Sequence, residues 1–156
     1  MLTAIWMESV WKVLNVKPNT LREYKRLYKR NLQPLIGQRE LDLVEAVDLQ
    51  TNLMQLTPQV ARHSLMLLKT IYREANLYKV SNTNPTVGLR TAPIRFEPKK
   101  FLTWEEINKL DWGKYNNQVR FVALHGLRWS EAVVLTDTDI RDGYVWVSKS
   151  VHGDVK

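Results

Sequence analysis

The chain has 156 residues, of which 44% are hydrophobic and 25% are charged, a composition typical of globular proteins. It contains no cysteine, which excludes disulfides, thiolate zinc sites and cysteine nucleophiles. No apolar run approaches the roughly 18 residues that a membrane span requires. The N-terminus lacks the basic segment and small-residue cleavage site of a targeting sequence, so we expect none.

Positive charge is unevenly distributed along the sequence. The formal net charge is +7 at pH 7. Residues 1–92 contain 13 Lys and Arg against 7 Asp and Glu, a net of +6, whereas residues 93–156 contain 10 against 9, a net of +1. This asymmetry predicts that the first part of the chain meets a polyanionic partner.

Two amphipathic helices are predicted at the start of the chain. Apolar residues recur at helical spacing over residues 2–14, and residues 16–19 interrupt the pattern at a proline. Thr20 then begins a second helix, because Glu23 follows three residues later in a capping-box pattern. The apolar stripe of this helix comprises Leu21, Tyr24, Leu27, Tyr28 and Leu32.

A cluster of cations lies outside that stripe. It comprises Arg22, Lys25, Arg26, Lys29 and Arg30. These charges repel one another unless an anion neutralises them, and Glu23 is the one acid in this stretch of sequence. The cluster therefore indicates contact with phosphates; the alternative is a solvated face of a basic protein.

A turn is predicted at residues 34–37, a weaker helix at residues 42–56, and a fourth helix after Thr57 and Pro58, which suit the N-cap and first helical positions. The buried stripe of this fourth helix comprises Leu65, Leu68, Ile71, Tyr72 and Ala75. A separate basic face comprises Arg62, Lys69 and Arg73, at spacings of seven and four. Packed through their apolar sides, the second and fourth helices would present paired basic faces to a duplex groove.

His63 has no metal-ligand partner at suitable spacing, so we expect a surface or capping role.

Residues 84–101 are predicted to be an extended linker, because three prolines punctuate them and no helical period survives. The linker is basic through Arg90, Arg95, Lys99 and Lys100. It is therefore suited to follow a phosphate backbone, although basic linkers are often merely solvated.

Short helices and a corner follow the linker. Thr103 and Glu106 form a second capping-box pattern, and residues 119–124 are predicted to be helical. Gly126 then ends that helix, and Ser130 is the expected N-cap of the next. Arg128 stands at the corner between them; a solvated arginine at a helical corner is the alternative to a functional one.

The period of the sequence changes to two after Leu135. Residues 136–140 and 144–147 are predicted to be strands of a hairpin around a turn at residues 141–143. Asp137 and Asp139 suit turn chemistry better than metal binding. A third strand is expected to begin at Val155 and Lys156, so we interpret the chain as truncated there.

Three groups of residues resemble the tyrosine recombinase (phage integrase) family. Residues 126–131 read Gly-Leu-Arg-x-Ser-Glu, as in the first arginine box of that family. Lys149 follows Arg128 by 21 residues and lies between two serines, like the lysine of the family's β-hairpin. The order of residues 20–37, with Asn84 and Pro85 later, is similar to the family's core-binding domain.

The resemblance implies a mainly α fold with a small antiparallel β-hairpin or sheet (α+β). It implies a four-helix SAM-like core-binding domain at residues 1–83, an interdomain linker at 84–101 and the first part of a catalytic domain at 102–156. The implied partner is double-stranded DNA, without a membrane, in the cytoplasm of a bacterium or a phage-infected cell. Family members form tetramers on DNA, whereas this chain is expected to be a monomer alone.

The resemblance also implies DNA strand exchange through a 3′-phosphotyrosine intermediate, without a metal or nucleotide cofactor. Arg128 would hold the scissile phosphate, Lys149 would protonate the leaving 5′-oxygen, and Glu131 would orient Arg128. The implied DNA contacts come from Arg22, Lys25, Arg26, Lys29, Arg62, Lys69, Arg73, Lys99 and Lys100.

The chain departs from the family pattern at three places. His125 replaces a small residue and is expected to be a packing variant, and the turn after Lys149 is one residue longer than usual. The His-x-x-Arg box and the tyrosine nucleophile would lie beyond residue 156, so the chain is expected to bind DNA without cleaving it. One alternative is a non-catalytic DNA-binding or regulatory protein derived from an integrase. Another is a helical module whose basic face meets an acidic protein.

Overall fold

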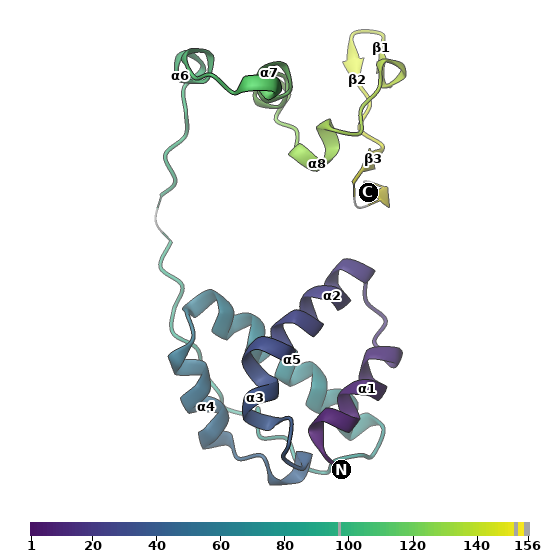
Figure 1. Cartoon of the computed structure of the whole chain (residues 1–156), viewed down its shortest axis with the longest axis vertical. Coiled ribbons are helices and arrows are strands. Elements are labelled where there is room, and N and C mark those ends of the chain that lie inside the picture. The colour runs from purple at the N-terminus through teal and green to yellow at the C-terminus, as the bar shows by residue number, and fades with distance from the viewer. Residues whose placement is uncertain (97, 152, 155–156) are drawn as a thin grey trace. The chain divides into compact units, whose positions relative to one another are not determined.

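The computed structural model describes residues 1–96, 98–151 and 153–154. The chain divides into two units, Met1–Phe96 and Glu97–Lys156, and each unit is described by itself. Across the described residues the protein is mainly helical, with short antiparallel strand pairs in the second unit (Figure 1). The prediction of an α+β protein is confirmed at this level.

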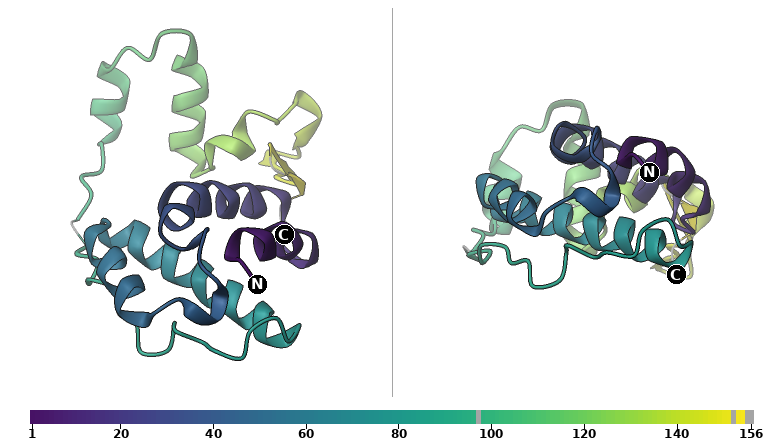
Figure 2. Two further views of the ribbon diagram at one scale, coloured as in Figure 1. Left: turned by 60° about the horizontal axis from the view of Figure 1, so that its bottom comes forward. Right: turned by 90° about the horizontal axis from the view of Figure 1, so that it is seen from below.

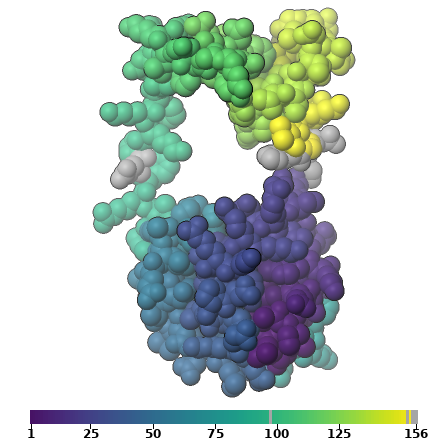
Figure 3. All heavy atoms as spheres, in the orientation of Figure 1, coloured from purple at the N-terminus to yellow at the C-terminus, as the bar shows by residue number. Residues whose placement is uncertain are grey.

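The regular secondary structure of the first unit is helical, apart from one isolated bridge between Leu2 and Glu40. Its elements are α1 (Thr3–Val13), α2 (Pro18–Leu27), the π-helical turn η1 (Tyr28–Leu32), α3 (Gln33–Ile36), the 3-10 turn η2 (Leu41–Leu43), α4 (Ala46–Gln55) and α5 (Pro58–Leu77). In the space-filling view these elements form a filled body coloured purple to teal (Figure 3).

Helix α5 is the centre of this unit. It packs against α4 at one end, against α1 at the other, and against α2 and η1 between them (Figures 1 and 2). Its buried side chains include Leu67, Leu68, Ile71 and Tyr72, all fully enclosed, as the helical spacing of its apolar residues requires. The Tyr72 hydroxyl donates a hydrogen bond of 3.1 Å to the Leu41 carbonyl, so the polar end of this core residue is satisfied.

Two sequence predictions for this unit are wrong. The second helix begins at Pro18 rather than at Thr20, because proline fits the first helical turn, where its missing N–H leaves no carbonyl unpaired. Thr20 therefore lies inside the helix, and no capping box forms with Glu23. The turn predicted at residues 34–37 is instead helix α3, which continues from η1. Pro34 occupies the first turn of α3, where a proline is again tolerated.

The segment after α5 belongs to the first unit as far as Phe96. Thr86 is buried, Leu89 packs against the core, and the Gln50 side chain exchanges two hydrogen bonds of 2.9 Å with the backbone of Arg90. The linker predicted at residues 84–101 therefore begins with residues that are packed on the helices. The boundary between the two units falls inside that predicted range.

The second unit consists of short elements. They are α6 (Trp104–Lys109), η3 (Gly113–Tyr115), α7 (Asn116–His125), α8 (Trp129–Ala132), η4 (Asp137–Asp139), β1 (Ile140–Arg141), β2 (Tyr144–Val145), β3 (Lys149–Ser150) and β4 (Gly153–Asp154). Thr103 and Glu106 form the predicted capping box at the start of α6. None of the helices in the described residues is both long and apolar enough to cross a membrane.

Two antiparallel strand pairs lie among the described residues of this unit. Strand β1 pairs with β2, with Ile140 opposite Val145, and β3 pairs with β4. Asp142 and Gly143 connect β1 to β2 with φ values of 53° and 79°, the positive values that a tight hairpin turn requires, so a hairpin forms here as predicted. It is shorter than predicted, because β2 ends at Val145 and Arg141 pairs in β1 and does not belong to the turn. Residues 136–139 are not its strand, because the Asp139 carboxylate caps the Thr136 N–H at 2.9 Å and closes a 3-10 turn. The strand predicted at Val155 and Lys156 lies outside the described residues.

Candidate nucleic-acid interface

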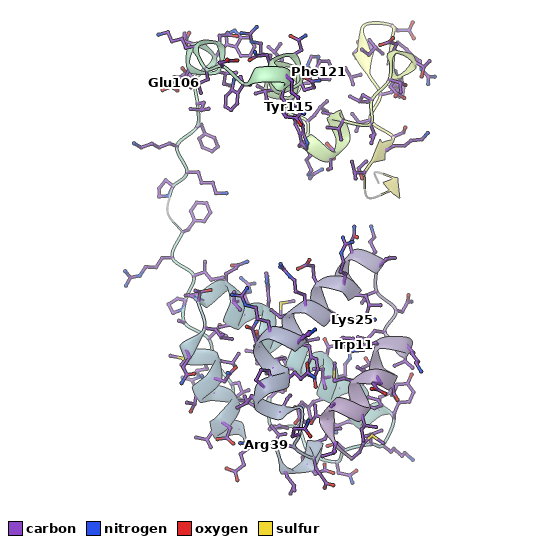
Figure 4. The ribbon with its side chains drawn as sticks, viewed as in Figure 1. Trp11, Lys25, Arg39, Glu106, Tyr115 and Phe121 are labelled. Carbon is purple, nitrogen blue, oxygen red and sulfur yellow. The ribbon has the colours of Figure 1, made fainter. Side chains whose placement is uncertain are left out.

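Helix α2 and the turn η1 separate an apolar side from a basic side. Tyr28 and Leu32 are buried against α5, whereas the five cations at residues 22–30 are all exposed. Figure 4 labels one of them, Lys25 of α2. Packing the apolar stripe into the core therefore leaves the cations on the surface, as the sequence predicted.

Two of these five cations have local partners. The Arg26 guanidinium forms an ion pair of 2.8 Å with Glu23, and the Arg22 guanidinium donates a hydrogen bond of 2.8 Å to the Asn19 side chain. Within the described residues, no carboxylate lies within the 4.0 Å of an ion pair from Lys25, Lys29 or Arg30. Arg22 pairs with a neutral amide, so four of the five positive charges have no acidic partner in this part of the structure.

The exposed side of α5 carries a second row of cations. Arg62, Lys69 and Arg73 are exposed, and Arg73 pairs with the neighbouring Glu74 at 2.7 Å. Met66 stands in the same row, because residues 62, 66, 69 and 73 follow one another at spacings of four, three and four. The row is therefore basic at three positions and apolar at one, with the Met66 side chain 54% exposed.

A groove of about 410 Å³ lies on the surface where α2 and α5 meet. Its apolar lining comes from Tyr24 and Leu27 of α2 and from Met66 of α5, and polar residues lie beside them. His63 also lines this groove and lies 3.3 Å from the Gln59 amide, which fits the predicted surface role. The groove was not predicted from the sequence, although the position of Met66 within the basic row was a signal that could have indicated it.

The cations predicted in the linker are divided between the two units. Arg90 and Arg95 belong to the first unit, whereas Lys99 and Lys100 precede α6 in the second. All four side chains are exposed. Lys99 and Lys100 therefore belong to a different unit from the cations of α2 and α5.

The arginine corner has the geometry that the sequence indicated, with one correction. Gly126 ends α7 in the left-handed conformation at φ 65°, which favours glycine. The N-cap of α8 is Arg128 and not Ser130, which lies within the helix. Arg128 takes this position because its backbone is extended and the Glu131 carboxylate accepts a hydrogen bond of 3.0 Å from its N–H.

The Glu131 carboxylate also binds the side chain of Arg128. The guanidinium Nη1 donates a hydrogen bond of 2.7 Å to Glu131 Oε1, and the Glu131 side chain is 9% exposed whereas that of Arg128 is 80% exposed. The Arg128 backbone N–H, and then its guanidinium, hold the pKa of the Glu131 carboxyl below its ordinary value, so it stays ionised at neutral pH. The arrangement orients the arginine and leaves most of its guanidinium open to an anion.

Strand β3 brings Lys149 close to the same corner. The Val151 N–H donates a hydrogen bond of 2.9 Å to the Ser130 carbonyl, which fixes the end of β3 against α8. The Lys149 side chain is exposed. Hydrogen bonds from Thr136 lower the pKa of Asp139, and the positive charge of Lys149 contributes to the same shift, so Lys149 also lies near η4. The structure thus places the predicted arginine, glutamate and lysine on adjoining elements of one unit.

His125, Tyr28 and Tyr72 pack against other side chains. His125 stacks on Phe121 with ring centroids 4.4 Å apart, which fits the predicted packing role. Burial raises the pKa of the Tyr28 hydroxyl to about 12, and Tyr72 is fully enclosed in the core. In the described ranges, no group of three or more His, Cys, Asp or Glu side chains is arranged to hold a metal ion.

Comparisons of the chain with models of known protein families, with curated proteins and with solved structures found no match.

Proposed function

We propose that the first unit is a DNA-binding module that holds duplex DNA on the exposed sides of α2, η1 and α5. The observation that carries this proposal is the cluster of five exposed cations at residues 22–30. Four of them, Arg22, Lys25, Lys29 and Arg30, lack a carboxylate partner among the described residues. Phosphates would neutralise this charge, and the release of their counterions would drive binding. The row on α5 supplies further cations on a helix that packs against α2.

We further propose that this unit is a SAM-like core-binding domain of the tyrosine recombinase type. The sequence resemblance supports this proposal, as does the presence of a helical unit before the arginine corner. In the full-length enzyme, Arg128 would bind the non-bridging oxygens of the scissile phosphate and Glu131 would position its guanidinium. Lys149 would donate a proton to the leaving 5′-oxygen. A tyrosine would attack the phosphorus, and the resulting phosphotyrosine would conserve the bond energy for rejoining.

A salt series on labelled duplex DNA tests the binding proposal. We expect the logarithm of the affinity to fall linearly with the logarithm of salt concentration, with a slope of about 0.9 for each phosphate contacted. An acidic polypeptide of equal charge, such as polyglutamate, should compete poorly. Affinity that is independent of salt would contradict the proposal. Equal competition by polyglutamate would favour the helical module that meets an acidic protein.

A nicked suicide substrate separates the enzyme from the non-catalytic alternative. The resemblance carries only Arg128, Lys149 and Glu131 of the catalytic set, so we expect residues 1–156 to form a complex that denaturing gels dissociate. A covalent protein–DNA adduct formed by this chain would contradict that expectation. A longer gene product that forms the adduct through a tyrosine would decide for the recombinase, and a product that never does would decide for the derived binding protein.

A further inference from the structure

Met66 interrupts a row of cations on the exposed side of α5. Arg62, Lys69 and Arg73 occupy the other positions of that row. The Met66 side chain is 54% exposed, whereas the apolar residues on the opposite side of the helix, such as Leu68 and Ile71, are fully enclosed. The packing of the first unit therefore does not account for an apolar residue at this position.

Met66 is also part of a larger apolar surface. It lines the groove of about 410 Å³ between α2 and α5 together with Leu27 and Tyr24, which come from the other helix. Asn19, Thr20 and His63 lie at the same groove and bring hydrogen-bonding groups to it, and the carboxylate of Glu23, which also lines it, is neutralised by an ion pair of 2.8 Å with Arg26. The surface thus combines an apolar lining from two helices with polar groups beside it.

The charges around the groove restrict what can cover it. Arg62 and Lys69 stand on either side of Met66 along α5, and within the described residues neither has a carboxylate at ion-pair distance. On α2, the charge of Arg26 is offset by Glu23, whereas Arg22 binds the neutral Asn19 side chain, a groove residue, and has no carboxylate at ion-pair distance among the described residues. An occupant of matching chemistry therefore carries negative charge at its edges and an apolar group between them.

The major groove of duplex DNA has this combination. Its edges are phosphates, and among the four bases only thymine presents an apolar group there, the C5-methyl. We propose that the groove between α2 and α5 contacts thymine C5-methyl groups through Met66, and so gives the chain a preference for thymine-containing sites. This inference rests on the proposed binding of duplex DNA and adds base selection to it.

Replacing thymine by uracil tests the inference, because uracil lacks the methyl group but keeps the same base-pairing edge and the same phosphate charge. The probes are two labelled duplexes of one length and sequence, one with dA·dT pairs and one with dA·dU pairs at every such position. We expect the wild-type chain to bind the thymine duplex more tightly, by roughly fourfold for each methyl group buried.

The variant Met66→Ala should lose this difference while it keeps the affinity of the wild type for the uracil duplex. Met66→Gln, which keeps the length of the side chain and replaces its apolar end by a polar one, should lose it as well. Met54→Ala is the matched control, because Met54 of α4 is 60% exposed and does not line the groove. This control should retain the full difference in affinity between the two duplexes. Comparison of Met66→Ala with this control therefore corrects for any change in duplex shape between thymine and uracil.

The outcomes distinguish this inference from the proposal on which it rests. Binding to neither duplex would overturn the DNA-binding proposal and the inference with it. Equal wild-type affinity for both duplexes would overturn the inference alone. It would also be overturned if Met66→Ala weakened binding to both duplexes by the same factor, since Met66 would then contribute without reading the methyl group.

Discussion

The two units of this chain place their apolar residues differently. In the first unit, α5 and the helices around it enclose a core that includes Trp6, Leu32 and Tyr72. Among the residues of the second unit whose burial is described, Glu131 is the one that is buried, and large side chains such as Phe101 and Leu124 are 90% and 64% exposed. The first unit is thus held by hydrophobic burial, and the second by local hydrogen bonds.

This difference extends to the way each unit presents charge. In the first unit, a rigid core holds many cations on one helical surface, which suits the binding of a long polyanion. In the second, the turn at Gly126 and the carboxylate of Glu131 orient a single exposed arginine. If the proposed function holds, affinity for DNA would come from the first unit, whereas the second unit would position Arg128 and Glu131 at one corner.

The largest expected effect comes from the core. Leu68→Ala removes a fully enclosed side chain of α5, so we expect the free energy of unfolding of the first unit to fall by about 2–5 kcal/mol. Leu124→Ala, the matched change at an exposed leucine of α7, should alter stability by less than about 0.5 kcal/mol. Urea unfolding followed by circular dichroism measures both changes. Equal losses for the two variants would contradict the difference between the units.

Amide hydrogen exchange compares the stability of the two units without substitutions. Amides in the middle of α5 should exchange only when the first unit unfolds, because the side chains around them are enclosed. Amides of α6 and α7 should exchange through local opening, and therefore much faster. Mass spectrometry or NMR resolves the two sets in a single sample. Protection in α7 as strong as that in α5 would show that the second unit has a stability of its own.

A smaller effect is expected from the titration of Glu131. Its folded pKa is lower than the ordinary value of 4.5, because the ionised carboxylate accepts hydrogen bonds from the backbone and side chain of Arg128. The contribution to stability is therefore fully present above the unfolded pKa and is lost as the pH falls through the folded pKa. The amide proton shift of Arg128 should report this transition with a midpoint below 4.5, and Glu131→Gln should abolish it. A midpoint at or above 4.5 would contradict the geometry of the corner.

The features that the sequence predicted well depend on residues close together in the chain. The capping box of Thr103 with Glu106 and the turn at Asp142 and Gly143 both formed, because neighbouring backbone and side-chain groups determine them. The same capping pattern at Thr20 failed, because an earlier proline provided a start for the helix.

Other features depend on contacts between distant residues and were therefore not predicted. The groove at Met66 requires α2 and α5 to pack side by side, which no local pattern encodes. The hydrogen bond of Val151 with Ser130, which holds the lysine-bearing strand against α8, likewise joins residues 21 positions apart. By contrast, the exposed cations of α2 were predictable, since the apolar stripe alone decides which side of a helix is buried.

The central claim, that DNA binds on α2 and α5, is tested most directly by two variants of equal charge. The first replaces Lys25, Arg26, Lys69 and Arg73 by glutamine, and the second replaces Lys12, Lys79, Lys109 and Lys114. The eight side chains are all exposed, and both variants lower the net charge from +7 to +3. Fluorescence anisotropy over a salt series measures the affinity of each for the same duplex.

We predict that the first variant loses at least about tenfold in affinity and that its salt slope falls by up to roughly four, one for each phosphate contact removed. The second variant should stay within about threefold of the wild type with a nearly unchanged slope, since net charge acts only at long range. Equal losses in the two variants, or an unchanged slope in the first, would contradict the assignment of the DNA-binding surface to α2 and α5.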